Sequence, residues 1–410
     1  MRTRTKKVAE ATLTFPPPPA AREPAPLERA ALDFGEKWAP ASEVLEWIRA
    51  VRTRFLGFNR AARVGGIPID RVTVVSGATH GGKTLYLLGL LYSFLEAGHI
   101  AAFIDAEGTT PQEFAAELMG DIKRMPRFIA PPGVLTFERA IDAVSDLVDG
   151  LAKHRAKEPN LCGIVVVDSV TKLAPKGELD KVKKKHAEEL TKGHHGRGRA
   201  SVIQSWLDNL TPRLRGSNLA VVLVAQERDL GIDEGGKRPA GVADGTDWLE
   251  PGVKMKGGKS LEFDSSLLVR VTKSEPVLLD PTDKRSAIVG WKHRVRIRKS
   301  KVAHMDGYFS ESFFHVSNGA GDTPAGFDVA RDALEVGTDV GVVKLDGAWY
   351  KWAPRSGGAM KKWQGGRAAL SYLSKHPDAL AALASEVADA IDRERGRVLQ
   401  PSGLIARTET

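Results

Sequence analysis

Cysteine is almost absent from this chain: among 410 residues there is one, Cys162. A single thiol excludes a disulfide framework and gives no thiolate set for a structural zinc ion, so the sequence suits a reducing compartment. No run of apolar residues is long enough to predict a membrane-spanning helix. The basic N-terminus is followed by four prolines in place of an apolar segment, which argues against a secretory signal. We therefore expect a cytoplasmic protein with no membrane partner.

Aromatic residues are also scarce, at 7%, and neither sign of charge is in large excess. The 60 Lys and Arg residues exceed the 51 Asp and Glu residues, for a net charge of +9. This sign favours an acidic partner such as nucleic acid, although many soluble proteins are mildly basic. Hydrophobic residues make up 42% of the chain, enough at this length for about two or three domains with sizeable cores.

Short β-branched apolar runs alternate with helical patterns through the middle of the chain. Because these runs are apolar on both faces, they predict an α/β fold with a mainly parallel sheet covered by helices on both faces. The expected strands cover residues 71–76, 100–105, 163–168, 219–225, 266–272 and 294–298, and the expected helices cover 111–119, 138–154 and 201–214. Two long polar segments, at about 176–199 and 227–259, interrupt the alternation, and loops of such length are usually functional or disordered.

Shifts in composition mark the other parts of the chain. Prolines and alanines fill the first forty or so residues, and Ser42 then stands as a helix cap before apolar residues at helical spacing. Near residue 320 the pattern changes to a short strand (DGAWYKW) and two helices. The predicted parts are a flexible arm over 1–41, a helix over 42–56, the α/β core over 57–320, a small α+β domain over 321–396 and a tail over 397–410.

A glycine-rich segment, GATHGGKT, stands between the strand at 71–76 and a helical pattern. It fits the spacing G-x-x-x-x-G-K-T, in which backbone N–H groups and a helix N-terminus converge on phosphate oxygens. The alternative is a glycine-rich turn that carries a lysine by chance, but the flanking strand and helix favour a nucleoside triphosphate site. In that site Lys83 would reach the β- and γ-phosphates and Thr84 would bind Mg²⁺. The loop around the phosphates would consist of Gly77, Ala78, Thr79, His80, Gly81 and Gly82.

Acidic residues follow two further apolar strands. Asp168 ends the strand GIVVVD, where a carboxylate would hold Mg²⁺; an aspartate at a strand end is otherwise a common turn residue. Asp105 and Glu107 follow the strand IAAFID, and ligands of parallel sheets bind at the carboxyl ends of strands. Glu107 is therefore expected either to polarise a water molecule against the γ-phosphate or to lie in solvent as an ordinary carboxylate.

A glutamine, Gln226, ends another apolar strand (LAVVLVAQ) and precedes the second polar segment. Its amide could bond the γ-phosphate and convert nucleotide state into order in that segment. A capping role at the strand end is the alternative, and the residues alone do not separate the two.

The motifs GATHGGKT, FIDAEG, VVVDSV and LVAQ occur in this order along the chain. Their order and wording resemble the bacterial RecA recombinases, as do GGIPIDRVTVVSG, KMKGGKSLEF, RVRIRKSKVA and the C-terminal DGAWYKW with its two helices. The resemblance covers about residues 55–395. It implies a RecA-like ATPase core with two DNA-binding loops, and ATP and Mg²⁺ as cofactors. It also implies single-stranded DNA and a homologous duplex as partners, and self-assembly into a helical filament.

The resemblance assigns roles residue by residue. Glu107 falls on the family's catalytic glutamate, Gln226 on its γ-phosphate sensor, and Phe114 on an aromatic residue that stacks on adenine. Lys299 and Lys301 fall on catalytic lysines that reach a neighbouring subunit's ATP; without the resemblance they would indicate only a solvated basic strand end. The expected DNA-binding residues of the two loops are Lys181, Lys183, Lys184, Lys185, Arg197, Arg199, Lys256, Gly257 and Gly258.

Some features depart from that family and suggest a divergent or phage-encoded member. The first loop carries an added basic stretch, and the C-terminal end is basic where bacterial members have an acidic tail. A metal site at His186, His194 and His195 is disfavoured, because their spacing is poor and no cysteine supports it. The alternative function is a hexameric helicase or a RadA-like branch-migration ATPase. Such relatives usually carry an arginine finger in place of KSK, and the RadA type adds a zinc finger whose cysteines this chain lacks.

Overall fold

The computed structural model describes residues 48–120, 125–133, 136–177, 195–229, 253–280, 283–303, 309–315 and 326–398. Contacts divide the chain into two units, Met1–Trp47 and Ile48–Thr410, and every described residue belongs to the second. The predicted arm over 1–41 and most of the tail over 397–410 lie outside the described residues, so both stay predictions. In the part of the chain that is described, no helix is long and apolar enough to cross a bilayer.

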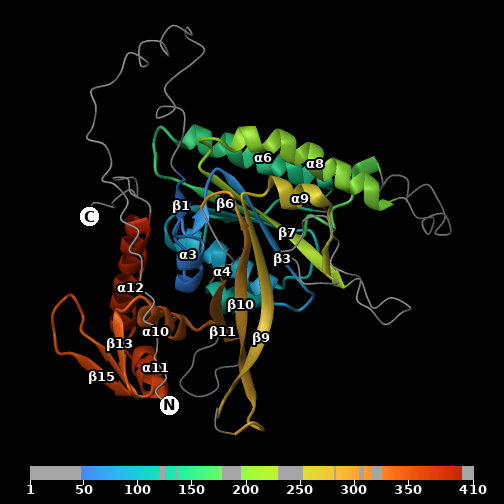
Figure 1. The fold of residues 1–410 in the computed structure, drawn as a ribbon. Coiled ribbons are helices and arrows are strands. Elements are labelled where there is room, and N and C mark those ends of the chain that lie inside the picture. The colour runs from blue at the N-terminus through green and yellow to red at the C-terminus, as the bar shows by residue number, and fades with distance from the viewer. Residues whose placement is uncertain are drawn as a thin grey trace, which may run out of the picture. The chain divides into compact units, whose positions relative to one another are not determined.

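One large, mainly parallel sheet forms the centre of this unit (Figure 1). Its strands follow the order β12 (Gly326–Phe327), β11 (Phe309–His315), β10 (Ile288–Ser300), β9 (Leu267–Leu278), β3 (Arg71–Gly77), β7 (Leu219–Asp229), β6 (Gly163–Asp168), β4 (Ile100–Asp105) and β5 (Phe128–Ile129). From β9 to β5 all neighbours are parallel, whereas β10, β11 and β12 add on antiparallel at one edge. The predicted α/β fold is confirmed.

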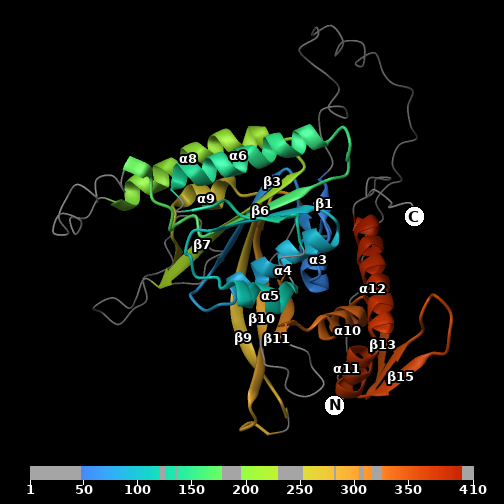
Figure 2. The ribbon, with the colours of Figure 1, turned by 180° about the vertical axis from the view of Figure 1, so that it is seen from behind.

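Helices cover both faces of the sheet (Figures 1 and 2). One face carries α6 (Phe137–His154), α8 (His195–Leu214) and α9 (Lys259–Asp264), and the other carries α3 (Leu56–Ala61), α4 (Lys83–Glu96) and α5 (Gln112–Met119). Successive side chains of a strand point to opposite faces. In β7, accordingly, Val222 and Val224 pack in the core with α4, while Val221 and Leu223 pack in the core with α6 and α8.

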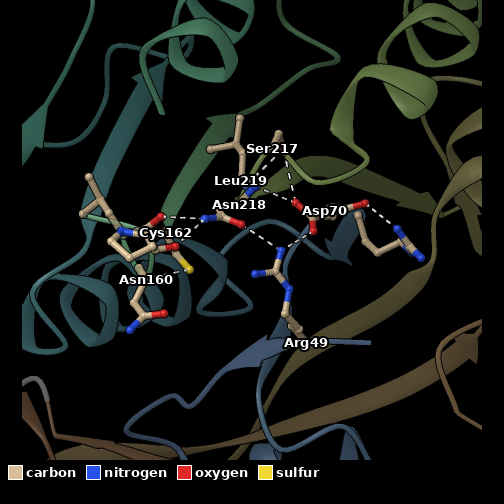
Figure 3. Close-up of polar contacts among 10 residues, drawn as sticks. Arg49, Asp70, Asn160, Cys162, Ser217, Asn218 and Leu219 are labelled. Atoms are coloured by element: carbon tan, nitrogen blue, oxygen red, sulfur yellow. Dashed lines mark hydrogen bonds and ion pairs between the residues drawn. The ribbon is translucent and has the colours of Figure 1, made fainter. Parts of the chain in front are cut away.

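Buried polar residues join the amino ends of the parallel strands (Figure 3). Asp70, just before β3, accepts a hydrogen bond from the N–H of Asn218 at 2.6 Å and another from the Arg49 guanidinium at 2.7 Å. Asn218, just before β7, accepts from Arg49 at 2.8 Å and donates to the carbonyl of Leu161 at 3.0 Å. This network connects the starts of β3 and β7, and the segment before β6, to Arg49 near the beginning of the described chain.

The predicted helix over residues 42–56 is wrong in its described part. Ala50–Val51 form strand β1, which pairs antiparallel with β2 (Ile67–Pro68), and α3 begins only after a turn. The N–H and the hydroxyl of Thr53 both donate to the Asn59 side-chain oxygen, at 2.9 and 2.8 Å, and hold that turn. The buried residues of this part alternate, at Val51, Thr53 and Phe55, which is the period of an extended segment and not of a helix.

The two polar segments are shorter as loops than the sequence predicted. Residues 178–194 lie outside the described residues, but α8 starts at His195, so 195–199 are helical and Arg197 and Arg199 belong to that helix. Residues 227–229 extend β7 and pair with β8 (Val253–Met255), because an antiparallel ladder continues the strand beyond the parallel sheet. α9 then begins at Lys259.

The C-terminal residues share a core of their own. α10 (Val329–Asp339), β13 (Val343–Asp346), β14 (Trp349–Trp352), β15 (Lys361–Gln364), α11 (Gly366–Lys375) and α12 (Pro377–Val398) pack around Trp352, Leu373 and Val387. The three strands form an antiparallel sheet. DGAWYKW supplies the turn after β13 and the whole of β14, so the predicted short strand is present as Trp349–Trp352. β12 lies inside the predicted 321–396 domain but pairs with β11 of the main sheet. The small α+β character is as predicted, but its own core begins only with α10.

Candidate nucleotide-binding site

Four strand ends meet at the carboxyl edge of the parallel sheet. The register pairs Gly77 of β3 with Gln226 of β7, and Asp105 of β4 with Asp168 of β6. β6 and β7 are themselves neighbours, so the four ends are continuous along one edge. Residues that were separate motifs in the sequence are thereby brought together where parallel sheets bind their ligands.

The glycine-rich segment forms a loop between β3 and α4. Gly82 has a φ of 91°, a left-handed value that favours glycine, and α4 starts directly after it without a side-chain cap. The amide groups at that helix start therefore remain for a ligand, and an anion is the ligand they favour. Lys83 Nζ donates to the carbonyls of Gly77 and Ala78 at 3.0 and 2.7 Å. The exposed part of the loop consists of Ala78, Thr79 and His80.

Charge in the loop is tuned by burial. Burial lowers the pKa of Lys83, and the carboxylates of Asp168 and Glu107 oppose that shift. The two carboxylates thus favour the protonated form of Lys83, although the side chain is partly removed from solvent. A phosphate near Lys83 would add a further, stronger anionic partner.

A hydroxyl and a carboxylate lie side by side at the start of α4. Thr84 Oγ1 donates to Asp168 Oδ2 at 3.1 Å. Burial raises the pKa of Asp168 to about 6, while the Thr84 hydrogen bond acts in the opposite direction. These are hard oxygen donors, which suit Mg²⁺ when phosphate oxygens and water complete its shell. Neither here nor elsewhere in the described ranges does a group of three His, Cys, Asp or Glu residues form a metal site of its own. The disfavoured histidine cluster lies outside those ranges or has undescribed side chains.

Glu107 is held at the edge by a side chain of β7 and by one that directly follows β6. Its Oε1 accepts a hydrogen bond from Ser169 Oγ at 3.1 Å, and another from the Gln226 amide nitrogen. The turn that carries it is built on Asp105, whose carboxylate accepts from the N–H groups of Glu107, Gly108 and Thr110 at 3.2, 2.8 and 3.0 Å. Glu107 therefore points along the edge toward Gln226 and is not an isolated surface carboxylate.

Gln226 connects this carboxylate to the end of the second polar segment. Its side-chain oxygen accepts from Lys256 Nζ at 3.3 Å, and its carbonyl accepts from the Lys256 N–H at 2.8 Å. Because the amide has a donor and an acceptor end, it faces Glu107 and Lys256 at once. If the Gln226 amide turned to donate to another acceptor, its oxygen would also move, and the hydrogen bond from Lys256 would change.

Gly257 and Gly258 follow Lys256 and pack tightly against helices. Both have left-handed φ values, 105° and 91°. A Cβ at Gly257 would lie 2.4 Å from Leu261 of α9, and one at Gly258 would lie 3.1 Å from Ala200 of α8. Glycine is thus favoured at both positions by the left-handed backbone, in addition to any close approach to nucleic acid.

The two lysines of the KSK motif share one environment. The ammonium groups of Lys299, in β10, and Lys301, just after it, both donate to the carbonyl of Phe263 at the C-terminal end of α9, with Lys299 at 2.8 Å. Lys299 also donates to the Glu262 carbonyl. Burial, and then the neighbouring Lys301, lower the pKa of Lys299 to about 8. Two cations therefore lie together over the negative end of a helix dipole.

Other predicted residues are not brought to this edge by any described contact. Phe114, half-buried in α5, packs against the apolar core on the α4 side, so adenine stacking stays a prediction. Arg199 is half-buried in the first turn of α8, and the side chain of Arg197 is outside the described residues. The same is true of the whole of Lys181, Lys183, Lys184 and Lys185.

The structure adds a buried ion pair that the sequence did not reveal. Glu227, next to Gln226, accepts from Arg270 Nε of β9 at 2.9 and 3.0 Å and from Ser76 Oγ of β3 at 2.9 Å. The side chains of Glu227 and Arg270 are 2% and 7% exposed. A charged residue inside the apolar run SLLVRVT was the one signal, because a buried arginine requires a partner.

Comparison with known proteins agrees with the geometry. The family model described as the RecA N-terminal domain matches residues 40–321. The chain is 29% identical to Protein RecA of Thermus aquaticus over 346 residues, which covers 84% of this chain and 86% of that protein. It is 28% identical to Protein RecA of Clostridioides difficile (strain 630) over 306 residues, or 74% of each chain. It is 26% identical to Protein RecA of Aquifex aeolicus (strain VF5) over 356 residues, or 87% and 88%.

Proposed function

The chain belongs to the RecA family, and we propose that it is a DNA-dependent ATPase that forms filaments on single-stranded DNA and carries out homologous pairing and strand exchange. The observation that carries the proposal is the contact between Glu107 and Gln226 at the edge that also holds the phosphate loop and the Thr84–Asp168 pair. A phosphate cradle alone would support binding only; a carboxylate fixed beside it supports hydrolysis. The proposal includes a cytoplasmic location and no membrane partner.

In this proposal the loop amides and Lys83 bind the β- and γ-phosphates of ATP. Thr84 and Asp168 hold Mg²⁺, which when bound neutralises charge on the phosphate oxygens. Phe114 stacks on adenine. Glu107 takes a proton from the attacking water, and Ser169, which donates to the same carboxylate oxygen at 3.1 Å, keeps the carboxylate oriented.

Gln226 reports the state of the nucleotide. Its amide nitrogen donates to Glu107 in this structure. The γ-phosphate is a competing acceptor, and turning the amide to it frees a lone pair of Glu107 for water. The same movement changes the acceptor that Lys256 contacts, and with it the end of the second DNA-binding loop, so ATP alters the grip on DNA.

Lys299 and Lys301 complete the site of a neighbouring protomer. Their present partners are backbone carbonyls at the end of α9, and a phosphate would be a stronger partner for both cations. Two cations near the transferred phosphate act as an arginine finger does, so hydrolysis depends on assembly.

The DNA-binding residues remain those of the two loops. Basic side chains there contact phosphates and leave bases free to pair with a duplex. The group consists of Lys181, Lys183, Lys184, Lys185, Arg197, Arg199 and Lys256, with Gly257 and Gly258 as the sites of close backbone approach.

The test of catalysis is Glu107→Gln, with Glu113→Gln, an exposed acid of α5, as its matched control. We expect Glu107→Gln to bind ATP and single-stranded DNA but to hydrolyse ATP about 10²- to 10⁴-fold more slowly, the usual loss of a general base. The control should hydrolyse normally, and Lys83→Ala should not turn over at all. Normal hydrolysis by Glu107→Gln would remove its role as base.

Two further assays test the assembly and the recombinase. Lys301→Ala should lose DNA-stimulated hydrolysis and regain it when mixed with Lys83→Ala, which has an intact lysine face but a defective phosphate loop. No recovery in mixed filaments would count against the contact across subunits. Strand exchange with homologous duplex, and none with heterologous duplex, is the expected result; unwinding without exchange would favour a helicase or branch-migration motor.

A further inference from the structure

The phosphate loop lies directly on strands β9 and β10. A Cβ at Gly77 would lie 2.3 Å from the carbonyl oxygen of Val271 in β9, and one at Gly81 would lie 3.1 Å from the same atom. A Cβ at Gly82 would lie 2.3 Å from the ring of His293 in β10. The loop is therefore supported by the Val271 carbonyl and by the His293 ring. A side chain on these glycines would not fit between the loop and strands β9 and β10.

His293 makes a directed contact with the loop as well as a packing contact. Its Nδ1 lies 3.0 Å from the carbonyl oxygen of Gly81, and the residue is 2% exposed. A carbonyl oxygen can only accept, so Nδ1 carries the proton in this contact. Burial lowers the pKa of His293, and Lys273, its register partner in β9, acts in the same direction, whereas the hydrogen bond to Gly81 acts in the opposite direction. Burial and Lys273 therefore favour the neutral ring, and the contact with Gly81 places its proton on Nδ1.

We propose that His293 is a positioning residue for the phosphate loop, which aims the Gly82 N–H at the bound phosphate. In a trans peptide the carbonyl and the N–H point in opposite directions. Gly81 supplies the carbonyl and Gly82 the N–H of one such unit, so holding the carbonyl against β10 turns the N–H away from β10 and into the loop. The proposal rests on the proposed ATP site, whose phosphates this N–H would meet.

The chemistry favours a buried ring for this task. A neutral imidazole provides a single N–H donor without an extra charge that would compete with the phosphates for Lys83. The ring cannot turn freely, because Gly82 lies against it. Because this donor is fixed before the nucleotide binds, less conformational entropy is lost when the loop becomes ordered around the phosphates. The resulting gain in binding free energy is the same for the ground state and the transition state.

The test compares two substitutions in the full-length protein. His293→Asn keeps an amide N–H at the place of Nδ1, whereas His293→Leu has a similar apolar bulk and no donor. With Mg–ATP and no DNA, we expect His293→Leu to raise the Kd roughly 3- to 10-fold, the loss of one neutral hydrogen bond. His293→Asn should stay within about 2-fold of the unsubstituted protein. In steady-state assays with DNA, KM should rise for His293→Leu while kcat stays unchanged.

Equal weakening by both substitutions would mean that only the ring's bulk matters, and unchanged binding by His293→Leu would mean that the contact does nothing; either result overturns the proposal. If His293→Leu does not fold, nitrogen NMR of the histidine rings decides, with His293→Asn used to assign the signal. A neutral ring protonated at Nδ1 is expected, and protonation at Nε2 alone would overturn the proposal. If the unsubstituted protein bound no nucleotide, the proposed function would fail, and the two failures would be distinguishable.

Discussion

The buried pair between Glu227 and Arg270 gives the sharpest prediction about stability. Arg270 donates to the Glu227 carboxylate from Nε at 2.9 and 3.0 Å and lies at 2.9 Å through Nη2, whereas Ser76 adds one neutral donor at 2.9 Å. The substitution Arg270→Met removes every charged donor among these and leaves a carboxylate that is 2% exposed. Breaking a buried pair in this way costs about 3–5 kcal/mol, because the remaining carboxylate is buried and has lost its bonded cation.

Urea unfolding of the full-length protein, followed by circular dichroism, measures the loss. Arg213→Met is the control: Arg213 and Asp149 lie 3.4 Å apart, but their side chains are 46% and 62% exposed. An exposed pair of this kind contributes at most about 1 kcal/mol. The double substitution Glu227→Gln with Arg270→Met removes both charges, so it should cost clearly less than the sum of the single substitutions.

A loss for Arg270→Met no larger than that for Arg213→Met would refute the reasoning. So would additivity in the double substitution, because two groups that interact directly are coupled. Because Glu227 follows Gln226 in β7, we also expect slower ATP hydrolysis at urea concentrations where the protein is still folded. Normal hydrolysis would show that the pair stabilises the fold without placing Gln226.

Three other predictions concern the rest of the chain. Burial raises the pKa of Asp332 to about 7 although the Leu56 N–H donates to it at 2.7 Å, so protonation stabilises the fold. This stabilisation is lost as pH rises from about 4 through about 7; Asp332→Asn should therefore flatten the fall in melting temperature between pH 5 and 8, and an unchanged slope would contradict this. Asp105→Ala removes the acceptor of three backbone N–H groups in the turn that holds Glu107; kcat for ATP should fall at least 10-fold, and unchanged turnover would argue against the turn's role. Lys256→Ala should reduce the slope of single-stranded DNA affinity against salt by about 0.7, the value for one phosphate contact, and an unchanged slope would place Lys256 off the DNA.

Local chemistry along the chain determined much of the fold. The runs that form β4 and β6 begin and end where the sequence predicts, because they are apolar on both faces and end at a carboxylate. The glycine-rich loop is recognisable from spacing, because its glycines and Lys83 act within eight consecutive residues. Parallel strands also place their carboxyl ends together, so the meeting of Asp168 with Thr84 follows from the fold class.

Tertiary structure decided which residues touch across that edge. The donors that reach Glu107 come from residues 62 and 119 positions away, and the ring beneath Gly81 comes from 212 positions away. Nothing local distinguishes His293 or Arg270 from other polar residues of a strand, since their roles depend on the register of β9 against β3 and β10. The same limit explains the wrong helix in the described part of 42–56, because the strand at Ala50–Val51 depends on pairing with β2, sixteen or more residues further along the chain. Sequence thus determined the local elements and the glycine-rich loop, whereas long-range register determined the contacts around Glu107, because hydrogen bonds between distant segments leave no periodic signal along the chain.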